Sequence, residues 1–221
     1  MSKNILLVNV SPRKKGSSAT LLDFVEEALE AAGDVTQRMD LYRSANDLEA
    51  FIIPIRTADT ILICGPCYIN TYPAEVVRLL ETLASHPDAL HKQNIYGLIQ
   101  GGMPYEHTHV SGLTMLKLFA ENENLVYRGG FVMGLGAAMD GKPLSSLPNG
   151  KKIQRRLSIF CNHVHNGDDS PDSVYRDSLI KIPRFLLGFM IASMNKKIDK
   201  SYASRGMDAN QPTPYQLDEI I

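Results

Sequence analysis

The sequence of 221 residues has few of the features that mark several large classes of protein. It contains only three cysteines, Cys64, Cys67 and Cys161. Such a small, odd number does not fit a disulfide framework and favours a reducing compartment. The formal net charge is −1, so no overall electric field draws the chain to nucleic acid or to a membrane.

Long hydrophobic runs are missing as well. The longest apolar segment, residues 182–194, is interrupted by Pro183, Arg184 and Gly188. It is also shorter than the roughly 20 residues that cross a bilayer. The first apolar run, near the N-terminus, ends in polar residues without a small-residue cleavage site, so we do not expect a signal peptide. These absences predict a cytoplasmic protein with no membrane span and no nucleic-acid partner.

Short aliphatic runs predict the strands of a parallel sheet. Four of them are apolar on successive residues and end at Gly, Pro or Ser: residues 5–10, 60–64, 95–100 and 131–135. Strands that are apolar on both faces are typical of parallel sheets covered on both sides. A fifth, less regular candidate spans residues 35–41, where alternate residues lie on one side.

Helical patterns lie between these strands. Apolar residues repeat at helical spacing over residues 21–32, 75–84 and 111–122, and residues 151–165 would form the last helix. A short helix strained by Pro54 is expected over residues 47–55. Alternating strands and helices predict an α/β fold, a doubly wound sheet of five parallel strands in the order 2-1-3-4-5.

The character of the chain changes near residue 167. A turn-rich stretch, NGDDSPDS, precedes a mostly helical segment and a polar tail. We therefore predict a domain over residues 1–166 and a helical extension over residues 167–221. The extension is expected to pack on the core or on a second subunit, and an interfacial membrane helix is the alternative.

The loop after the first strand, SPRKKGSSAT at residues 11–20, has the composition of an anion site. In a sheet of this order, ligands lie at the carboxyl ends of the first and third strands. A helix N-terminus offers free N–H groups, and Ser11, Ser17 and Ser18 add hydroxyl donors. Arg13 can form charge-assisted hydrogen bonds with a phosphate. The alternative is a capped helix start with solvated basic residues.

Two well-known nucleotide fingerprints are absent from this loop. It matches neither G-x-x-x-x-G-K-[ST] nor G-x-G-x-x-G, so ATP hydrolysis and ordinary dinucleotide binding are disfavoured.

A second loop, GPCYINTYPA at residues 65–74, follows the third predicted strand. Two prolines stiffen it, and it carries two tyrosines and an asparagine. A rigid, partly apolar loop beside a phosphate site suits a flat aromatic ligand, whose polar edge Asn70 could read. The alternative is that the tyrosines only pack in the core.

These stretches resemble the flavodoxin-like NAD(P)H-dependent FMN reductases. VNVSPRKKGSSATLL, residues 8–22, is similar to the family's G-S-P-R-x-x-G-x-[ST] phosphate loop. ADTILICGPCYINTYPAEV, residues 58–76, is similar to its flavin loop, A-D-x-[hydrophobic]-x-x-x-[ST]-P-x-Y-x-x-x-x-P. QGGMPY, residues 100–105, is similar to its Gly-rich loop after the fourth strand. The resemblance covers about residues 3–140 and implies a flavodoxin-like fold.

The resemblance also implies site residues. The FMN phosphate would be held by Ser11, Arg13, Ser17 and Ser18. The isoalloxazine would be bordered on one side by Pro66, Cys67, Tyr68, Ile69 and Asn70, and on the other by Gly101, Gly102 and Tyr105.

Three departures from the family pattern affect these loops. Val10 replaces the usual glycine, and Gly65 replaces a common Ser or Thr. Ile69 replaces a common aromatic residue, which removes one stacking partner for the ring.

The activity implied by the resemblance is that of an FMN-dependent NAD(P)H oxidoreductase. NADH or NADPH would supply the electrons, and a small acceptor such as free flavin or a quinone would receive them. A homodimer is expected, because in this family the flavin commonly lies near a dimer interface. Two alternatives are a flavodoxin-type electron carrier and a non-enzymatic binding module with the same fold.

No side chain stands out as a catalytic acid or base, because the flavin would carry the chemistry. Tyr105 and His107 are the only candidates beside the open face of the ring. No metal site is predicted, since His107 and His109 lack a third ligand at suitable spacing. Cys64 and Cys67 are expected to be packing residues.

Overall fold

The computed structural model describes residues 2–171, 174, 178–181 and 183–207. The chain forms two compact units, Met1–Ile180 and Lys181–Ile221. The first unit contains the whole sheet and every predicted site residue.

Five parallel strands form one sheet in the order β2-β1-β3-β4-β5, which confirms the predicted doubly wound, flavodoxin-like class. The central strand β3 is buried along its whole length, as its continuous apolar run predicts. The strands are β1 (Asn4–Asn9), β2 (Val35–Asp40), β3 (Thr60–Pro66), β4 (Asn94–Gln100) and β5 (Val126–Met133).

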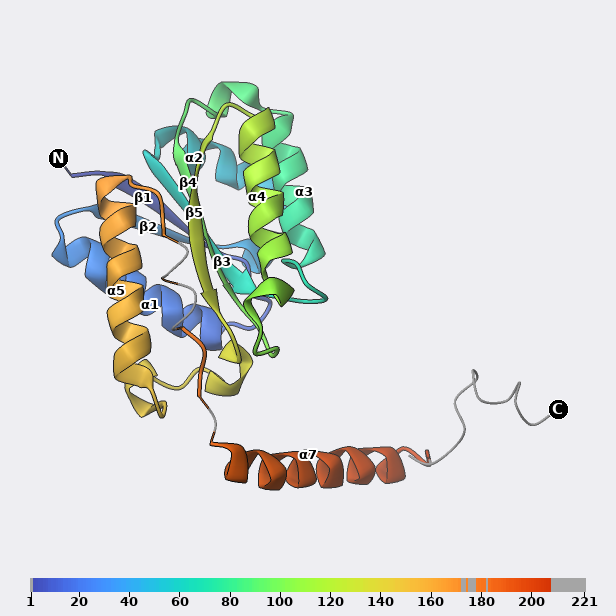
Figure 1. The fold of residues 1–221 in the computed structure, drawn as a ribbon. Helices are drawn as coiled ribbons and strands as arrows, with labels where there is room; N and C mark the ends of the chain where they lie inside the picture. Colours follow the sequence, from blue (N-terminus) through green and yellow to red (C-terminus); the bar gives the residue numbers. More distant parts are fainter. Residues whose placement is uncertain (1, 172–173, 175–177, 182, 208–221) are drawn as a thin grey trace. The chain divides into compact units, whose positions relative to one another are not determined.

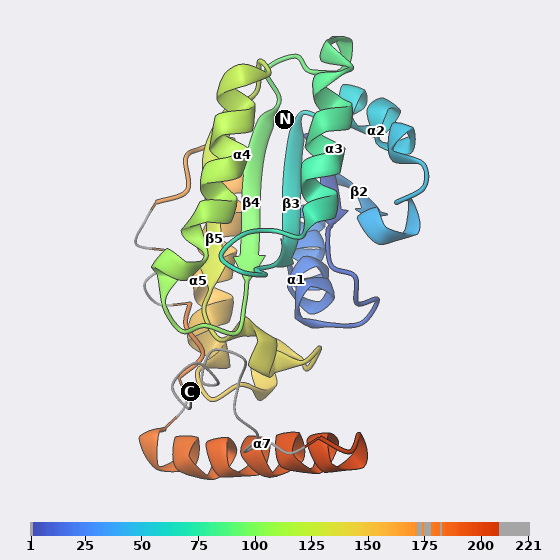
Figure 2. The ribbon, with the colours of Figure 1, turned by 90° about the vertical axis from the view of Figure 1, so that its right-hand side faces the viewer.

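Helices cover both faces of this sheet. Figure 1 shows α1 (Ser17–Ala31) and α5 (Gly150–Asn166) on one face and α3 (Ala74–Ala84) and α4 (Val110–Asn122) on the other. In Figure 2 the face with α3 and α4 is turned toward the viewer, and the short α2 (Ile52–Thr57) lies near the β2 end of the same face. Short 3₁₀ turns join these elements: η1 (Leu41–Arg43), η2 (Leu48–Phe51), η3 (Pro87–Ala89), η4 (Glu106–Thr108), η5 (Gly136–Met139) and η6 (Leu144–Ser146).

A buried tyrosine packs between the sheet and α4. Tyr72 is 2% exposed, and its hydroxyl donates to the carbonyl oxygen of Ile63 at 3.2 Å. A Cβ on Gly65, Gly97 or Gly112 would lie 3.3, 3.0 or 3.2 Å from this side chain. These glycines therefore leave the space that the ring occupies. Tyr72 packs in the core, as the alternative for the tyrosines of this loop predicts.

Two elements differ from their predicted bounds. Strand β5 begins at Val126, before the predicted residue 131. The sequence pattern missed its first half because these residues are only partly buried and include Gly129 at φ 91°. The predicted helix over residues 47–55 is split into η2 and α2. Pro54 lies in the first turn of α2, where its missing N–H breaks no helical hydrogen bond.

The described residues between 168 and 180 (168–171, 174 and 178–180), here called the strap, include contacts to β5 and belong to the first unit, although the sequence analysis assigned them to the extension. Ser170 and Ser178 donate their hydroxyls to carbonyl oxygens of β5. The amide of Ile180 donates to the carbonyl of Gly134, just beyond that strand, at 3.2 Å. Val174 and Ile180 are buried, so the described part of the strap adds to the core.

The second unit contains the helix α7 (Arg184–Ser204), which confirms that the extension is helical. Large apolar side chains are exposed along it: Phe185, Leu186, Phe189, Ile191, Met194, Ile198 and Tyr202. No helix in the described ranges combines the length and apolar character needed to cross a membrane. What α7 packs against stays a prediction.

Two truncations test the contribution of the strap. A chain ending after Ile180 should fold cooperatively, because it keeps the sheet, both helical layers and the strap. A chain ending after Gly167 loses the burial of Val174 and Ile180, worth about 1.5–3 kcal/mol each, and several hydrogen bonds worth about 1 kcal/mol each. Urea denaturation should place the shorter chain at least about 3 kcal/mol below the longer one. Equal unfolding free energies would rule out a structural role for the strap.

Candidate functional site

The start of α1 lacks a side-chain cap. Gly16 precedes the helix in extended conformation, no side chain hydrogen-bonds to the first-turn amides, and the first turn contains no acidic residue. Uncapped first-turn N–H groups and the helix dipole give this end a partial positive charge. The geometry disfavours the alternative of a capped helix start and leaves donors for an anion.

Local hydrogen bonds shape the loop before this helix. The amide of Ser11 donates to Asn9 Oδ1 at 3.1 Å, and the amide of Arg13 donates to Ser11 Oγ at 3.2 Å. Asn9, which is 1% exposed, donates its own amide group to Asp40 at 2.7 Å. Sequence analysis missed Asn9, although a polar residue at the end of a buried strand is a signal that could have identified it.

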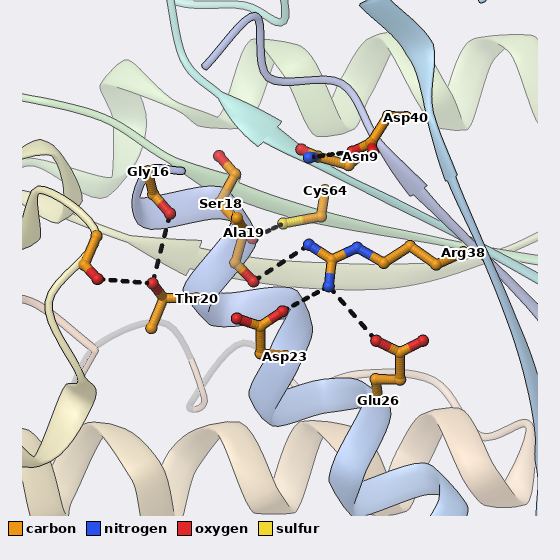
Figure 3. A network of polar contacts seen from close by, with 11 residues as sticks. Asn9, Gly16, Ser18, Ala19, Thr20, Asp23, Glu26, Arg38, Asp40 and Cys64 are labelled. Atoms are coloured by element: carbon orange, nitrogen blue, oxygen red, sulfur yellow. Dashed lines mark hydrogen bonds and ion pairs between the residues drawn. The ribbon is translucent and has the colours of Figure 1, made fainter. Parts of the chain in front are cut away.

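Arg38 of β2 fixes the position of α1 on the sheet. Figure 3 shows its guanidinium between the helix and the strand, bonded to Asp23 at 2.5 Å, to Glu26 at 3.4 Å and to the carbonyl of Ala19 at 3.4 Å. This side chain is 23% exposed, so the ion pairs are partly shielded from water.

A pocket of about 210 Å³ opens between the first loop, the second loop and the Gly-rich loop. It lies at the carboxyl ends of β1, β3 and β4, where the order of the sheet predicts a ligand site. Its lining brings together most of the residues that the resemblance implied: Ser11, Arg13, Ser17, Pro66, Cys67, Tyr68, Gly101 and Gly102, joined by Gly16, Gln100 and Ala137.

Four implied residues do not line the pocket, and two of them are Ser18 and Tyr105. Ser18 is buried, and its hydroxyl accepts a hydrogen bond from Gln100 Nε2 at 3.3 Å. Tyr105 is exposed and stacks on His107, with ring centroids 5.5 Å apart.

Ile69 and Asn70 form a tight turn next to Tyr68. Tyr68 and Thr71 exchange two backbone hydrogen bonds of 2.7 and 3.3 Å across it. Both central residues have positive φ, 49° at Ile69 and 68° at Asn70, as in a type I′ turn. A β-branched residue rarely adopts this conformation, and Ile69 is 97% exposed at the tip. The structure does not bring either side chain into the pocket lining.

His109 and Cys67 pack against Gly101 at the edge of the pocket. A Cβ on Gly101 would lie 2.5 Å from His109 Nε2 and 3.0 Å from the Cβ of Cys67, so only glycine fits there. His109 Nδ1 lies 2.9 Å from the carbonyl oxygen of Tyr105 and therefore carries the proton. Burial lowers the pKa of His109 and keeps the ring neutral.

Cys67 is suited to packing rather than to reaction. Burial raises the pKa of its thiol, which donates to the carbonyl of Thr108 at 3.2 Å. All three cysteines are free. Within the described residues, no three His, Cys, Asp or Glu side chains form a group that could hold a metal ion.

Two further residues of the site were missed by the sequence analysis. Gln100 is 6% exposed, and its Oε1 has no hydrogen-bond partner among the described residues. Asp140, in the loop after β5, pairs with Arg13 at 2.6 Å. The hydrogen bond and charge of Arg13 hold the pKa of Asp140 below its usual range. No local sequence pattern indicates Gln100 or Asp140, because each contacts residues that are far away in the chain.

Two departures from the family pattern occupy the same space. The Cγ2 of Val10 lies 2.2 Å from the point where a Cβ on residue 65 would stand. The valine at position 10 therefore requires the glycine at position 65, and the two departures compensate each other.

A double-mutant cycle tests this compensation. Gly65→Ala should destabilise the protein by about 1–3 kcal/mol, because the new methyl group overlaps Val10. In the Val10→Ala background the same substitution should cost at least about 1 kcal/mol less, because Cγ2 is gone. Chemical denaturation of the four proteins gives the coupling energy. Additive effects would show that the two positions are independent.

Comparison with known proteins places this chain among flavin reductases. The family model of NADPH-dependent FMN reductase matches residues 3–137. No curated protein sequence matches the chain.

Several solved structures share the fold. An NADH:FMN oxidoreductase, EMOB, in its apo form is 17% identical with a TM-score of 0.60, over 84% of this chain and 99% of that one. An NAD(P)H:quinone oxidoreductase from Methanothermobacter marburgensis is 15% identical with a TM-score of 0.56, over 75% and 96%. General stress protein 14 from Treponema denticola, in complex with FMN, is 16% identical with a TM-score of 0.51, over 75% and 98%.

The family match covers more than half of the sequence and includes the phosphate loop, the flavin loop and the Gly-rich loop. The chain therefore belongs to the NADPH-dependent FMN reductase family and is an FMN-dependent NAD(P)H oxidoreductase.

Proposed function

We propose that the pocket at the carboxyl ends of β1, β3 and β4 binds FMN with its phosphate against the start of α1. The observation that carries this assignment is the uncapped helix start, which adjoins Arg13 and the hydroxyl-bearing residues Ser11 and Ser17 in one pocket lining. A phosphate there would accept hydrogen bonds from backbone amides and from the guanidinium. Ser18 contributes through its amide, since its hydroxyl is engaged by Gln100.

The isoalloxazine would lie between the second loop and the Gly-rich loop. Pro66, Cys67 and Tyr68 line one side of the pocket, and Gly101 and Gly102 line the other. The volume of about 210 Å³ is below the 300–1,000 Å³ usual for larger ligands, so the pocket would take the phosphate, the ribityl chain and the inner edge of the ring.

The ring would then extend past the pocket toward the exposed Tyr68. Ile69 and Asn70, in the turn beside Tyr68, and Tyr105 would border its outer part.

The bound flavin supplies hydride acceptance from NADH or NADPH and electron delivery to a second substrate. The protein's residues bind and orient it. Gly101 and Gly102 carry no side chain that would block close approach of the ring. His109, whose Nδ1 lies 2.9 Å from the carbonyl oxygen of Tyr105, would support this backbone.

We further propose a small electron acceptor such as free flavin or a quinone, a cytoplasmic location, and a homodimer. Three free cysteines agree with a reducing compartment. The exposed apolar side chains of α7 support self-association. Sedimentation equilibrium of the full chain tests the dimer: a mass twice that of the chain supports it, and a monomer mass refutes it.

Anaerobic reduction tests the activity. The protein loaded with FMN should lose its yellow colour when NADH or NADPH is added without oxygen, and a quinone added afterwards should restore it. The measurement is the absorbance of the flavin band. If neither nucleotide bleaches the bound flavin while dithionite does, the protein is an electron carrier and not a reductase.

Replacing Arg13 tests the phosphate site. Arg13→Ala should weaken FMN binding by about 1.5–3 kcal/mol, because a charge-assisted hydrogen bond to the phosphate is lost. Titration with quenching of flavin fluorescence gives the dissociation constant. Riboflavin, which has no phosphate, is the matched control and should bind both proteins equally. An unchanged FMN affinity would remove Arg13 from the site.

A further inference from the structure

A carboxylate lies beside the residue that would bind the phosphate. Asp140 Oδ1 is 2.6 Å from Arg13 Nη2. The two residues are far apart in sequence and belong to different loops, Arg13 to the loop before α1 and Asp140 to the loop after β5. The first turn of α1 has no acidic residue of its own, so Asp140 brings a negative charge to an end of the helix that otherwise lacks one.

The backbone around Asp140 is held against the phosphate loop. The carbonyl of Gly141 accepts a hydrogen bond from Thr20 Oγ1 at 3.1 Å. A Cβ on Gly141 would stand 3.5 Å from the Cα of Gly16, so the two loops touch. Asp140 has φ 48°, and its amide donates to the carbonyl of Ala137 at 3.3 Å. The carboxylate is therefore positioned by the fold of its loop.

The Arg13 side chain is shared between the pocket and this carboxylate. It passes over Gly16, where a Cβ would lie 3.4 Å from the Cβ of Arg13, and it also lines the pocket. A guanidinium has five N–H donors, and Asp140 engages the Nη2 group. A phosphate monoester in the pocket would carry a charge of about −1.5 to −2 at neutral pH. It would have to displace the carboxylate or share the guanidinium with it.

We propose that Asp140 competes with the phosphate of the flavin for Arg13 and so limits how strongly the site prefers FMN over riboflavin. The inference rests on the proposed function, since it assumes that the pocket takes a flavin phosphate. In physical terms, the ligand replaces one anionic partner of Arg13 with another, so the loss of the exposed Asp140 pair offsets part of the gain from the phosphate pair. The remaining carboxylate also repels the phosphate. Asp140 thus lowers the affinity of the site for the phosphate of FMN.

The experiment compares FMN and riboflavin binding to the wild-type protein and to Asp140→Asn. The variant keeps the size of the side chain and removes its charge. FMN should bind about three- to tenfold tighter to the variant at low salt, and riboflavin should bind within about twofold of the wild type. The gain for FMN should shrink as salt rises, because both charges are exposed to solvent. The gain for FMN should also shrink in the Arg13→Gln background, because there is no guanidinium for Asp140 to compete for.

Glu27→Gln is the matched control. It removes an exposed carboxylate further along α1, changes the net charge of the chain by the same amount, and should leave the ratio of the two affinities unchanged. An unchanged ratio in Asp140→Asn, or weaker FMN binding, would overturn the competition. If the wild-type protein binds neither flavin, the proposed function itself fails. If it binds both and only the ratio is insensitive to Asp140, the proposed function stands and this inference alone falls.

Discussion

The site depends on one constraint: the first-turn amides of α1 have no side-chain acceptor, and the helix is nevertheless held at the carboxyl edge of the sheet. The Arg38 ion pairs and the contact between Cys64 Sγ and the carbonyl of Ser18 hold it there. From β4, Gln100 reaches the same turn through Ser18. Because residues of β2, β3 and β4 all contact the start of this helix, its uncapped N–H groups are held at the edge of the pocket.

Much of the fold could be predicted from the sequence, because a parallel sheet buries its strands on both faces and so imposes continuous apolar runs. The strand order, the two helical layers and the helical extension followed from that pattern. The first half of β5 did not, since it contains Tyr127, Arg128 and a glycine at positive φ and so has no continuous apolar run to detect. This part of β5 forms because it pairs with β4, which its own polar sequence does not indicate.

The site was predictable to the level of loops but not of individual side chains. Most residues implied by the resemblance line one pocket, because the ends of parallel strands meet at one edge. The turn at Ile69 and Asn70 was not foreseen, since left-handed dihedrals at a β-branched residue go against local preference. Gln100 and Asp140 were missed for another reason: their relevance comes from contacts with residues distant in sequence. In the sequence, Val10 and Gly65 are two separate departures from the family pattern. In the structure they are coupled, because the side chain of Val10 occupies the space that a Cβ at position 65 would need.

The strap makes the two ends of the sheet unequal. Since its side-chain and backbone donors occupy carbonyl groups on the outer side of β5, no further strand can pair there without displacing it. The opposite end of the sheet, β2, is the one at which another extended chain could add. That strand carries Arg38, whose partly buried charge is already paired with Asp23 and Glu26 of α1. The sheet is thus covered by the strap at its β5 edge, and at its β2 edge the partly buried charge of Arg38 disfavours the addition of a further strand.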